Sequence, residues 1–274
     1  MPEYPEVTVV TNALNEIVKF KKIKEVIVNL DKIIKNVDVE KFKNTLKDKV
    51  IFSIENIGKY IVIKFESDWS IIAHMRMEGK FFYETNNFLR NKKHDLIIFV
   101  FDDGNKLIYN DTRRFGTMDL HYGDVNNFPK ISKLGNLPNQ LDASKIMDKC
   151  KRKTTAIKTT LLDQELVLGI GNIYADEILY ASKINPLTKA KDISLNQWKT
   201  ILNFGHTIMT RSIELGGSTV NSYSSINNKE GSYQNELKVY GKYKEFCTTC
   251  KSQFEKIKVN GRGTTYCPKC QKTR

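Results

Sequence analysis

The sequence predicts an α+β protein of two domains, with an antiparallel β-sandwich or barrel first, a helical region second and a small cysteine-rich segment last. The length of 274 residues allows two domains that each bury a core. Short runs of alternating or β-branched residues dominate the first half, whereas helical periodicity dominates after residue 150. We therefore expect a strand-rich domain over residues 1–130, a linker over 131–149, a helical domain over 150–240 and a finger over 241–274.

The first domain is expected to begin with a helix. Pro5 suits a first helical turn, and aliphatic residues between positions 7 and 18 recur on one face. A second helix is expected over residues 39–46, and Asp103-Gly104 indicates a hairpin. The expected strands, whose short lengths and close turns are typical of an antiparallel sandwich, cover residues 23–30, 50–57, 60–65, 70–74, 80–83, 96–101 and 106–109.

The second domain should be helical. Pro129, Gly135 and Pro138 mark the connecting segment, after which helices are expected over residues 154–162, 174–181 and 195–213. The polar segment 216–231, rich in Ser, Asn and Gly, is long for a connection. Such a segment is either a plain surface loop or a loop that closes over a substrate.

A glycine turn separates the first two of these helices. Gly169 and Gly171 permit a tight turn before Asn172 and leave amides exposed at a helix N-terminus, where phosphate binds well. The turn does not match a dinucleotide fingerprint well, because no third glycine follows at the required position and a helix, not a strand, precedes it. In a basic protein this arrangement favours a motif that holds the DNA backbone.

The first six residues carry a candidate nucleophile. A proline in the second position normally allows removal of the initiator methionine, which would leave Pro2 as a free secondary amine. An α-amino group titrates at about pH 8, so part of it is uncharged at neutral pH and can attack a sugar carbon to form an iminium. Glu3 and Glu6 lie within one turn of chain and could act as proton donor or electrostatic partner. The alternative is that Pro-Glu simply begins a helix.

The net charge of +13 and the pI of about 9.3 favour a polyanionic partner, most simply nucleic acid. A compositional bias toward lysine is the alternative explanation. No apolar run approaches the roughly 20 residues that span a bilayer, and the N-terminus lacks a secretory apolar core. Cytoplasmic residence is therefore the expectation.

Four of the five cysteines form two Cys-x2-Cys pairs near the C-terminus, separated by sixteen residues. This spacing is typical of a four-cysteine zinc ribbon with a hairpin between the pairs, and closed sites of this kind are structural. The hairpin tip presents Arg262 between two glycines, a shape suited to a phosphate or a minor groove. Cys150 is left over and is expected to be a small buried residue. The expected zinc ligands are Cys247, Cys250, Cys267 and Cys270.

Three groups in the first domain are candidates for DNA contact. Lys59 follows Gly58 at a turn, Met77 follows the end of a strand that includes His74, and Arg113 and Phe115 lie in the loop after another strand. An arginine beside an aromatic residue or a methionine can enter a base stack and fill the gap left by a flipped nucleotide. The alternative is that Met77 and Phe115 are core residues and Lys59 is an ordinary surface lysine.

The motifs and their order along the chain resemble those of the formamidopyrimidine-DNA glycosylase family. Bacterial members of this family remove oxidised purines such as 8-oxoguanine. The resemblance covers essentially the whole chain. Its motifs are Pro2-Glu3-x-Pro5-Glu6-Val7, His74-x-Arg76-Met77-x-Gly79, Asp111-x-Arg113-x-Phe115-Gly116, Leu161-Leu162-Asp163-Gln164 through Gly169-x-Gly171-Asn172-Ile173-Tyr174, Gly216-Gly217-Ser218-Thr219, and the zinc ribbon with Gly261-Arg262-Gly263-Thr264.

The resemblance implies a β-sandwich domain, a helix-two-turn-helix domain, one structural zinc ion and a monomer that acts on damaged double-stranded DNA. It implies that Pro2 attacks C1′ with help from Glu3, that Glu6 and Lys59 support this step, and that β- and δ-eliminations follow. Met77, Arg113 and Phe115 would fill the gap, with Arg113 pairing with the orphan cytosine. Other implied DNA contacts are His74, Asn172, Tyr240 and Arg262, and the implied lesion loop includes Ser218, Thr219 and Tyr233.

Some residues depart from the family pattern. Tyr4 and Thr8 replace a common leucine and glutamate, and Thr112 stands where proline or valine is usual, but none of the three removes a group that does chemistry. Two alternatives stay open. One is an endonuclease VIII type enzyme for oxidised pyrimidines, against which Met77, Arg113 and Phe115 argue. The other is a non-catalytic DNA-binding protein. The presence of Pro2, Glu3 and Lys59 argues against it, because a protein that only binds DNA needs none of them.

Overall fold

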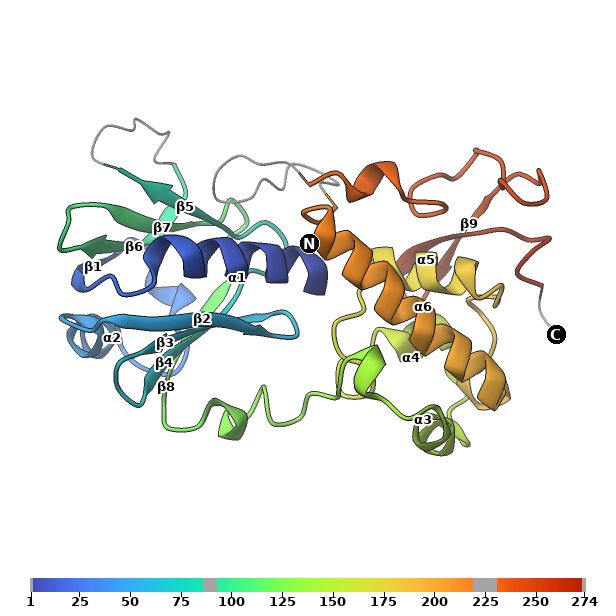
Figure 1. Ribbon diagram of the computed structural model, residues 1–274, viewed down its shortest axis with the longest axis horizontal. Helices are drawn as coiled ribbons and strands as arrows, with labels where there is room; N and C mark the ends of the chain where they lie inside the picture. Colours follow the sequence, from blue (N-terminus) through green and yellow to red (C-terminus); the bar gives the residue numbers. More distant parts are fainter. Residues whose placement is uncertain (1, 86–92, 219–230, 273–274) are drawn as a thin grey trace. The chain divides into compact units, whose positions relative to one another are not determined.

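The computed structural model describes residues 2–85, 93–218 and 231–272. The chain forms two compact units, of which the N-terminal unit contains residues 1–132 and 215–232 and the C-terminal unit contains residues 133–214 and 233–274 (Figure 1). Among the helices of the described residues, none is both long and apolar enough to cross a membrane.

The N-terminal unit contains two four-stranded antiparallel sheets, ordered β2-β3-β4-β8 and β1-β6-β7-β5. The expected strands all form, with ends within two residues of the predicted ones. The structure adds β8, which is not among the predicted strands although apolar Met118 and Leu120 alternate with polar residues in its sequence, as in a strand. The strands are β1 (Ile23–Val28), β2 (Ile51–Ile57), β3 (Tyr60–Phe65), β4 (Trp69–His74), β5 (Lys80–Glu84), β6 (Asp95–Phe101), β7 (Lys106–Asn110) and β8 (Thr117–Tyr122).

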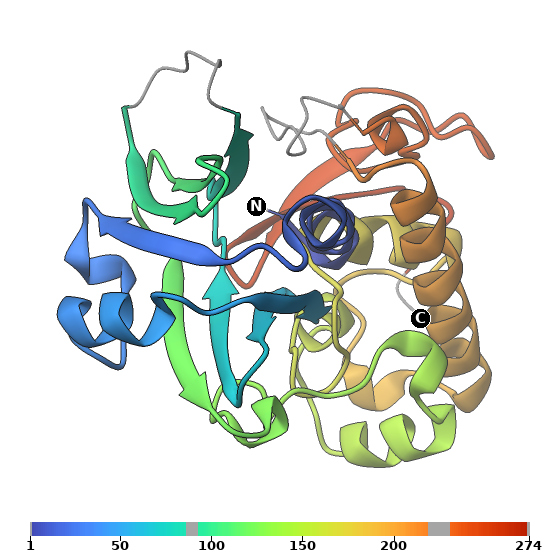
Figure 2. The same ribbon diagram turned by 60° about the vertical axis from the view of Figure 1, so that its left-hand side comes forward.

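Helix α1 (Tyr4–Val18) contributes one apolar stripe to the core that the two sheets share. Figure 2 views this helix nearly along its axis, and β2 is the strand that packs most closely against it. Val7, Val10 and Leu14 are almost fully buried, as the helical spacing predicts. Helix α2 (Val39–Leu46) begins where predicted, and the Asp38 carboxylate caps it by accepting the Lys41 N–H at 2.7 Å. The first residues of the chain are thus attached to a rigid, packed helix.

The C-terminal unit is built around the long helix α6 (Leu195–Glu214), against which α3 (Ala143–Cys150) and α5 (Asn172–Ala181) pack (Figure 1). Helix α4 (Ile157–Leu161) precedes the glycine turn, and β9 (Glu255–Val259) pairs with β10 (Arg262–Tyr266) as the expected hairpin. We expect a linker over residues 131–149 because of their proline and glycine content. The structure instead has a 3₁₀ turn (Pro138–Gln140) and α3 there. Helix α3 buries Ala143, Ile146 and Cys150, at the i, i+3, i+7 spacing of a packed face.

A buried ion pair joins two helices of this unit to the hairpin. The ammonium of Lys158 lies 2.7 Å from the carboxylate of Asp176, and both side chains are at most 1% exposed. Lys158 also donates to Thr264 Oγ1 at 2.8 Å and to the Gly263 carbonyl at 3.0 Å, while Asp176 accepts the Thr265 N–H at 3.0 Å. Because each charge has further hydrogen-bond partners, the pair avoids much of the cost of desolvation. It connects α4, α5 and β10 at one point.

We predict that Lys158→Met lowers the free energy of unfolding by about 3 kcal/mol at pH 7, because it leaves the Asp176 carboxylate buried without its cation. Burial raises the pKa of Asp176 to about 6, so the loss should shrink at pH 5, where protonation removes the charge. Guanidinium unfolding at both pH values measures this loss. Lys151→Met, which breaks the exposed pair with Asp148, is the control and should cost less than about 0.5 kcal/mol. Equal losses in the two variants would contradict the prediction.

Candidate active site and nucleic-acid interface

The N-terminal residues are held by the carboxylate of Glu6. Its Oε2 accepts the Glu3 N–H at 2.9 Å and its Oε1 accepts the Ser218 N–H at 2.9 Å. Pro2 is buried, and Glu3 and Glu6 are only 2% and 3% exposed. The structure therefore brings Pro2, Glu3, Glu6 and Ser218 together, although Ser218 lies 212 positions along the chain from Glu6.

The backbone beside Glu6 requires glycine. Gly216 and Gly217 have φ angles of +77° and +81°, and a Cβ on Gly217 would lie 3.2 Å from the Glu6 Cγ. The Ser232 N–H donates to the Leu215 carbonyl at 2.9 Å and so closes the base of the expected lesion loop. Thr219 lies outside the described residues. Tyr233 belongs to the C-terminal unit, where its ring stacks on Tyr174 at 6.0 Å.

Lys59 and His74 both follow or end strands of the β2-β3-β4-β8 sheet. Lys59 lies in the β2–β3 turn after Gly58, which has φ +56°, and is 8% exposed. His74 ends β4, packs edge-on against the Tyr60 ring and accepts the Arg76 N–H on Nδ1 at 3.0 Å. Burial, followed by the charges of Arg76, Lys59 and Lys130, lowers the pKa of His74 to about 3. A neutral imidazole that accepts on Nδ1 carries its proton on Nε2, which makes Nε2 a hydrogen-bond donor.

Met77, Arg113 and Phe115 are surface residues. Met77 is 38% exposed and Phe115 is 52% exposed, so the alternative in which they belong to the core is wrong. The Arg113 guanidinium lies over the Phe115 ring, 4.8 Å from its centroid. Beneath them the fully buried Asp111 accepts the N–H groups of Arg113, Phe115 and Gly116 at 2.8–2.9 Å. A buried carboxylate thus shapes a loop that exposes an arginine and an aromatic ring.

In the C-terminal unit, α5 supports the expected phosphate contacts. Asn172 begins this helix, and its side-chain amide donates to the Gly263 carbonyl at 3.2 Å, next to the exposed Arg262. The buried carboxylate of Glu177 accepts the N–H groups of Lys238, Val239 and Tyr240 at 2.8–2.9 Å. One helix therefore fixes the backbone near Asn172, Tyr240 and Arg262.

The four expected zinc ligands converge. The sulfurs of Cys247, Cys250, Cys267 and Cys270 all lie within 4.8 Å of one another, and no other such group of His, Cys, Asp or Glu occurs in the described part of the chain. Zinc–sulfur bonds of about 2.3 Å in a tetrahedron separate the sulfurs by about 3.8 Å. The Cys247–Cys270 and Cys250–Cys267 distances are 3.8 and 3.4 Å, so the donor set fits a zinc ion.

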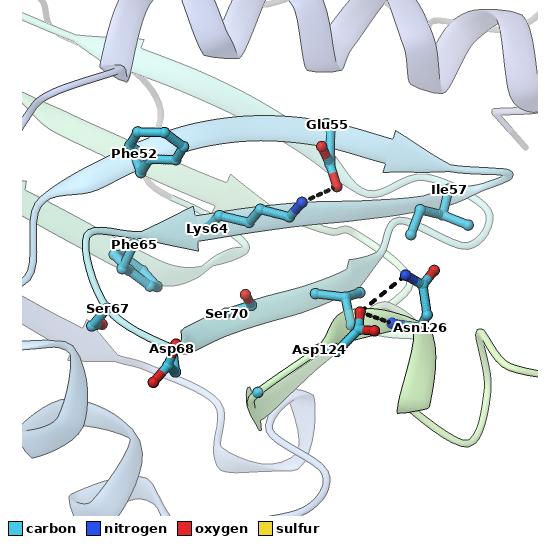
Figure 3. A pocket seen from close by; sticks show the side chains of 12 residues that line it. Phe52, Glu55, Ile57, Lys64, Phe65, Ser67, Asp68, Ser70, Asp124 and Asn126 are labelled. Atoms are coloured by element: carbon cyan, nitrogen blue, oxygen red, sulfur yellow. Dashed lines mark hydrogen bonds and ion pairs between the residues drawn. The ribbon is translucent and has the colours of Figure 1, made fainter.

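A separate cavity of about 320 Å³ lies along β2, β3 and β4 and the loop after β8 (Figure 3). An ion pair between Glu55 and Lys64 and the Asp124 carboxylate contribute to its lining. None of its lining residues is a predicted site residue. This cavity is therefore not the candidate active site.

Comparison with known proteins identifies each part of the chain. Residues 1–118 match the formamidopyrimidine-DNA glycosylase N-terminal domain, residues 134–224 its H2TH domain, and residues 244–273 the zinc finger found in FPG and IleRS. The formamidopyrimidine-DNA glycosylase of Mycoplasmopsis pulmonis is 44% identical over 277 residues, covering 100% of this chain and 99% of that protein. The chain belongs to the formamidopyrimidine-DNA glycosylase family.

Further family members and solved structures agree with this assignment. The formamidopyrimidine-DNA glycosylase of Lactobacillus helveticus is 42% identical, covering 99% of both chains. Two crystal structures of Lactococcus lactis Fpg are 36% identical to this chain in sequence. One is of a point mutant with DNA that contains Fapy-dG, and the other is with DNA that contains an abasic site. Each superposes with a TM-score of 0.93, and each alignment covers 99% of this chain and 100% of the Lactococcus lactis chain. The predicted fold class and family are confirmed.

In this glycosylase fold, the buried acids that hold the site, apart from Glu6, carry no role predicted from the sequence. Asp111 belongs to one of the family motifs, and Asp176 and Glu177 lie within a segment that the sequence predicts only as a helix. Their signal is an acid within an otherwise apolar segment, as in Tyr174-Ala175-Asp176-Glu177-Ile178 on α5. An acidic pair at such a buried position indicates a structural hydrogen-bond role, because buried charges need partners.

His74 predicts a specific dependence of stability on pH. Its folded pKa of about 3 lies below its unfolded value of 6.5, so its contribution is fully present above pH 6.5 and is lost as the pH falls toward 3. Between pH 6.5 and 5 the wild type should therefore lose on the order of 1 to 2 kcal/mol more than His74→Gln, which lacks the titrating group. Urea unfolding of both proteins at several pH values measures the difference. Parallel stability curves would show that the imidazole is not held neutral.

Proposed function

We propose that this protein is a bifunctional DNA glycosylase and AP lyase that excises oxidised purines, including 8-oxoguanine and formamidopyrimidines, during base-excision repair. The observation that carries the proposal is the buried N-terminal cluster, in which Glu6 fixes Glu3 beside Pro2. The Lactococcus lactis complexes, which hold DNA with Fapy-dG or an abasic site, support the choice of substrate.

The reaction begins at the secondary amine of Pro2 once Met1 has been removed. The nitrogen lone pair attacks C1′ of the damaged nucleotide as the bond from C1′ to the base breaks, and the proton that the amine loses goes to the departing base. The bond from C1′ to the sugar ring oxygen then breaks as the C1′=N bond forms, and Glu3 protonates that oxygen to give the ring-opened iminium. A proton acceptor then removes a C2′ proton and the 3′ phosphate leaves, after which loss of a further sugar proton expels the 5′ phosphate. Water hydrolyses the C1′=N bond, which frees Pro2, releases the sugar and leaves a gap with phosphate ends. Glu6 positions the N-terminus, and Lys59 supports the chemistry next to the lesion and its phosphate.

The exposed residues of both units supply the DNA contacts. Met77, Arg113 and Phe115 enter the stack when the damaged nucleotide leaves it, and Arg113 pairs with the orphan cytosine. The contacts that these three side chains make in the stack offset part of the cost of unstacking the nucleotide, which is a few kcal/mol. The phosphate backbone is bound by His74, Asn172, Tyr240 and Arg262, and the net charge of +13 strengthens binding at low salt.

One zinc ion has a structural role in the finger. The described apolar core around it consists of Val239, Cys247, Phe254 and Cys267, with partly buried neighbours, which is too small to hold the hairpin alone. When bound to the four thiolates, the ion holds the hairpin that presents Arg262. The protein acts as a monomer on double-stranded DNA, and its cytoplasmic residence stays a prediction.

The nucleophile can be tested by trapping. Incubation with a duplex that contains 8-oxoguanine opposite cytosine, followed by borohydride and mass spectrometry, should place a reduced adduct on Pro2. Pro2→Gly should reduce excision by at least about a hundredfold, because it replaces the secondary amine, and should leave DNA affinity within about twofold. An adduct formed only with an oxidised pyrimidine would instead support an endonuclease VIII type specificity. Adduct formation by protein that retains Met1 would overturn the role of Pro2.

Removal of zinc should weaken DNA binding by about tenfold or more, because the phosphate contact of Arg262 depends on the folded hairpin. Thermal unfolding of the N-terminal unit should change much less, since that unit has its own core. Fluorescence anisotropy before and after verified chelation measures the affinity. Cys250→Ser should reproduce the loss, whereas Cys150→Ser, at a buried cysteine outside the finger, should keep both metal and affinity. Unchanged affinity after metal loss would contradict the role of the hairpin.

A further inference from the structure

Two turns of the N-terminal unit meet at a single hydroxyl group. The first turn contains Met77 and is closed by the Gly79 N–H, which donates to the Met75 carbonyl at 3.1 Å. The second contains Arg113 and Phe115. An ideal Cβ on Gly79 would lie 2.3 Å from the Tyr109 hydroxyl oxygen, and one on Gly116 would lie 1.6 Å from it. Both glycines therefore leave the space that this hydroxyl occupies.

Tyr109 is well suited to hold that position. It is 1% exposed on β7, and its ring packs against the Phe81 ring at 5.2 Å. Its hydroxyl donates to Asp111 Oδ2 at 3.4 Å, a long hydrogen bond, and burial raises the pKa of Tyr109 so that the proton is retained. The ring fixes the hydroxyl from the core side, and the two glycines enclose it from the side of the turns.

Asp111 extends this support into the second turn. Its Oδ1 accepts the Arg113 N–H at 2.9 Å, and its Oδ2 accepts the N–H groups of Phe115 and Gly116 at 2.9 and 2.8 Å. Each of these bonds has a charged acceptor shielded from water, so each is stronger than a bond between neutral groups. The backbone on both sides of Arg114 is therefore fixed before any ligand binds.

A second contact joins the turns at the surface. The Thr112 hydroxyl donates to the Glu78 carboxylate, which links the residue after Met77 to the residue before Arg113. Each turn also contains an arginine in the left-handed region, Arg76 and Arg114, both at φ +57°. Residues other than glycine keep such a conformation only when the surrounding contacts over-determine it. The two turns are thus held as one unit.

We propose that Tyr109 and Asp111 are positioning residues that join the Met77 turn and the Arg113–Phe115 turn into one rigid wedge, and that this rigidity sets the selectivity for the base opposite the lesion. The inference rests on the proposed function, in which Met77, Arg113 and Phe115 fill the gap in the duplex. A guanidinium distinguishes cytosine from adenine by the geometry of its hydrogen bonds, so a wedge that is ordered in advance keeps that discrimination. A loose wedge would still enter the stack but would accept either base.

The test compares single-turnover excision of 8-oxoguanine opposite cytosine and opposite adenine. Tyr109→Phe keeps the ring and removes the hydroxyl, and should lower the cytosine-to-adenine rate ratio by about tenfold. Thr112→Val removes the exposed link between the turns and should lower the ratio by about two- to threefold. Asp111→Asn loses acceptors for the backbone and should have the largest effect. Tyr122→Phe, which removes a tyrosine hydroxyl that donates to Asp68 at the far end of β8, should leave the ratio unchanged.

A second measurement separates positioning from a general loss of structure. Borohydride trapping on a single-stranded abasic oligonucleotide needs Pro2 but has no stack to fill and no opposite base to select. Tyr109→Phe and Thr112→Val should therefore trap this substrate at the wild-type rate. A parallel fall in trapping would indicate a general structural role and would overturn the proposal, as would an unchanged base ratio in both variants.

Arg113→Ala distinguishes failure of this inference from failure of the proposed function. If Arg113→Ala lowers the base ratio and the Tyr109 and Thr112 variants do not, the wedge reads the opposite base without needing its support, and only the inference fails. If Arg113→Ala itself leaves the ratio unchanged, the role of the wedge in the proposed function fails, and the inference fails with it.

Discussion

The candidate site depends on buried carboxylates that accept backbone N–H groups. Glu6 accepts those of Glu3 and Ser218, Asp111 accepts three within the Arg113–Phe115 turn, and Glu177 accepts three at residues 238–240. Burying a carboxylate without partners would destabilise the fold by several kcal/mol. Two or three hydrogen bonds from N–H groups offset this desolvation cost. These acids also fix segments that no regular ladder of hydrogen bonds holds.

This use of acids explains how a chain with a net charge of +13 can present an ordered cationic surface. The acids lie beneath the turns, while Arg113 and Arg262 lie exposed above the backbone that those acids or their neighbours fix. A flexible cationic loop would bind phosphate as well, but it would lose conformational entropy on binding and would position its side chains poorly. Because the acids hold the backbone, the side chains of Arg113 and Arg262 can stay exposed to solvent.

The same arrangement accounts for the unusual backbone of the site. Arg76 and Arg114 adopt left-handed conformations that a side chain normally disfavours, and they do so in the two turns that Tyr109 and Asp111 support. Gly216 and Gly217 also have left-handed φ angles, and a side chain on Gly217 would meet the Glu6 carboxylate. Left-handed residues such as Phe20 and Asp48 also occur elsewhere in the described chain, so this conformation is not confined to the candidate site. The packed α1 and β7 beside the site are regular.

Most elements and motifs could be predicted from local order along the chain. Periodicity placed every strand of the N-terminal unit except β8. The paired Cys-x2-Cys motifs predicted the β9–β10 hairpin and a sulfur cluster that the structure contains, and the order of short motifs identified the family. Such features depend on neighbours a few residues apart, which is why they can be read without a fold. The helix in the expected linker was missed because proline and glycine content obscured a short apolar stripe.

The contacts that hold the site could not be predicted in this way. Glu6 and Ser218 are 212 positions apart, Lys158 and Thr264 are 106 apart, and Glu177 and Tyr240 are 63 apart. The acceptor is a side chain in each carboxylate contact, but the donor is a backbone N–H that every residue except proline possesses. Residue identity therefore indicates the candidate nucleophile and the expected metal ligands, whereas the partner of each buried acid is decided only when folding brings a particular backbone segment beside it.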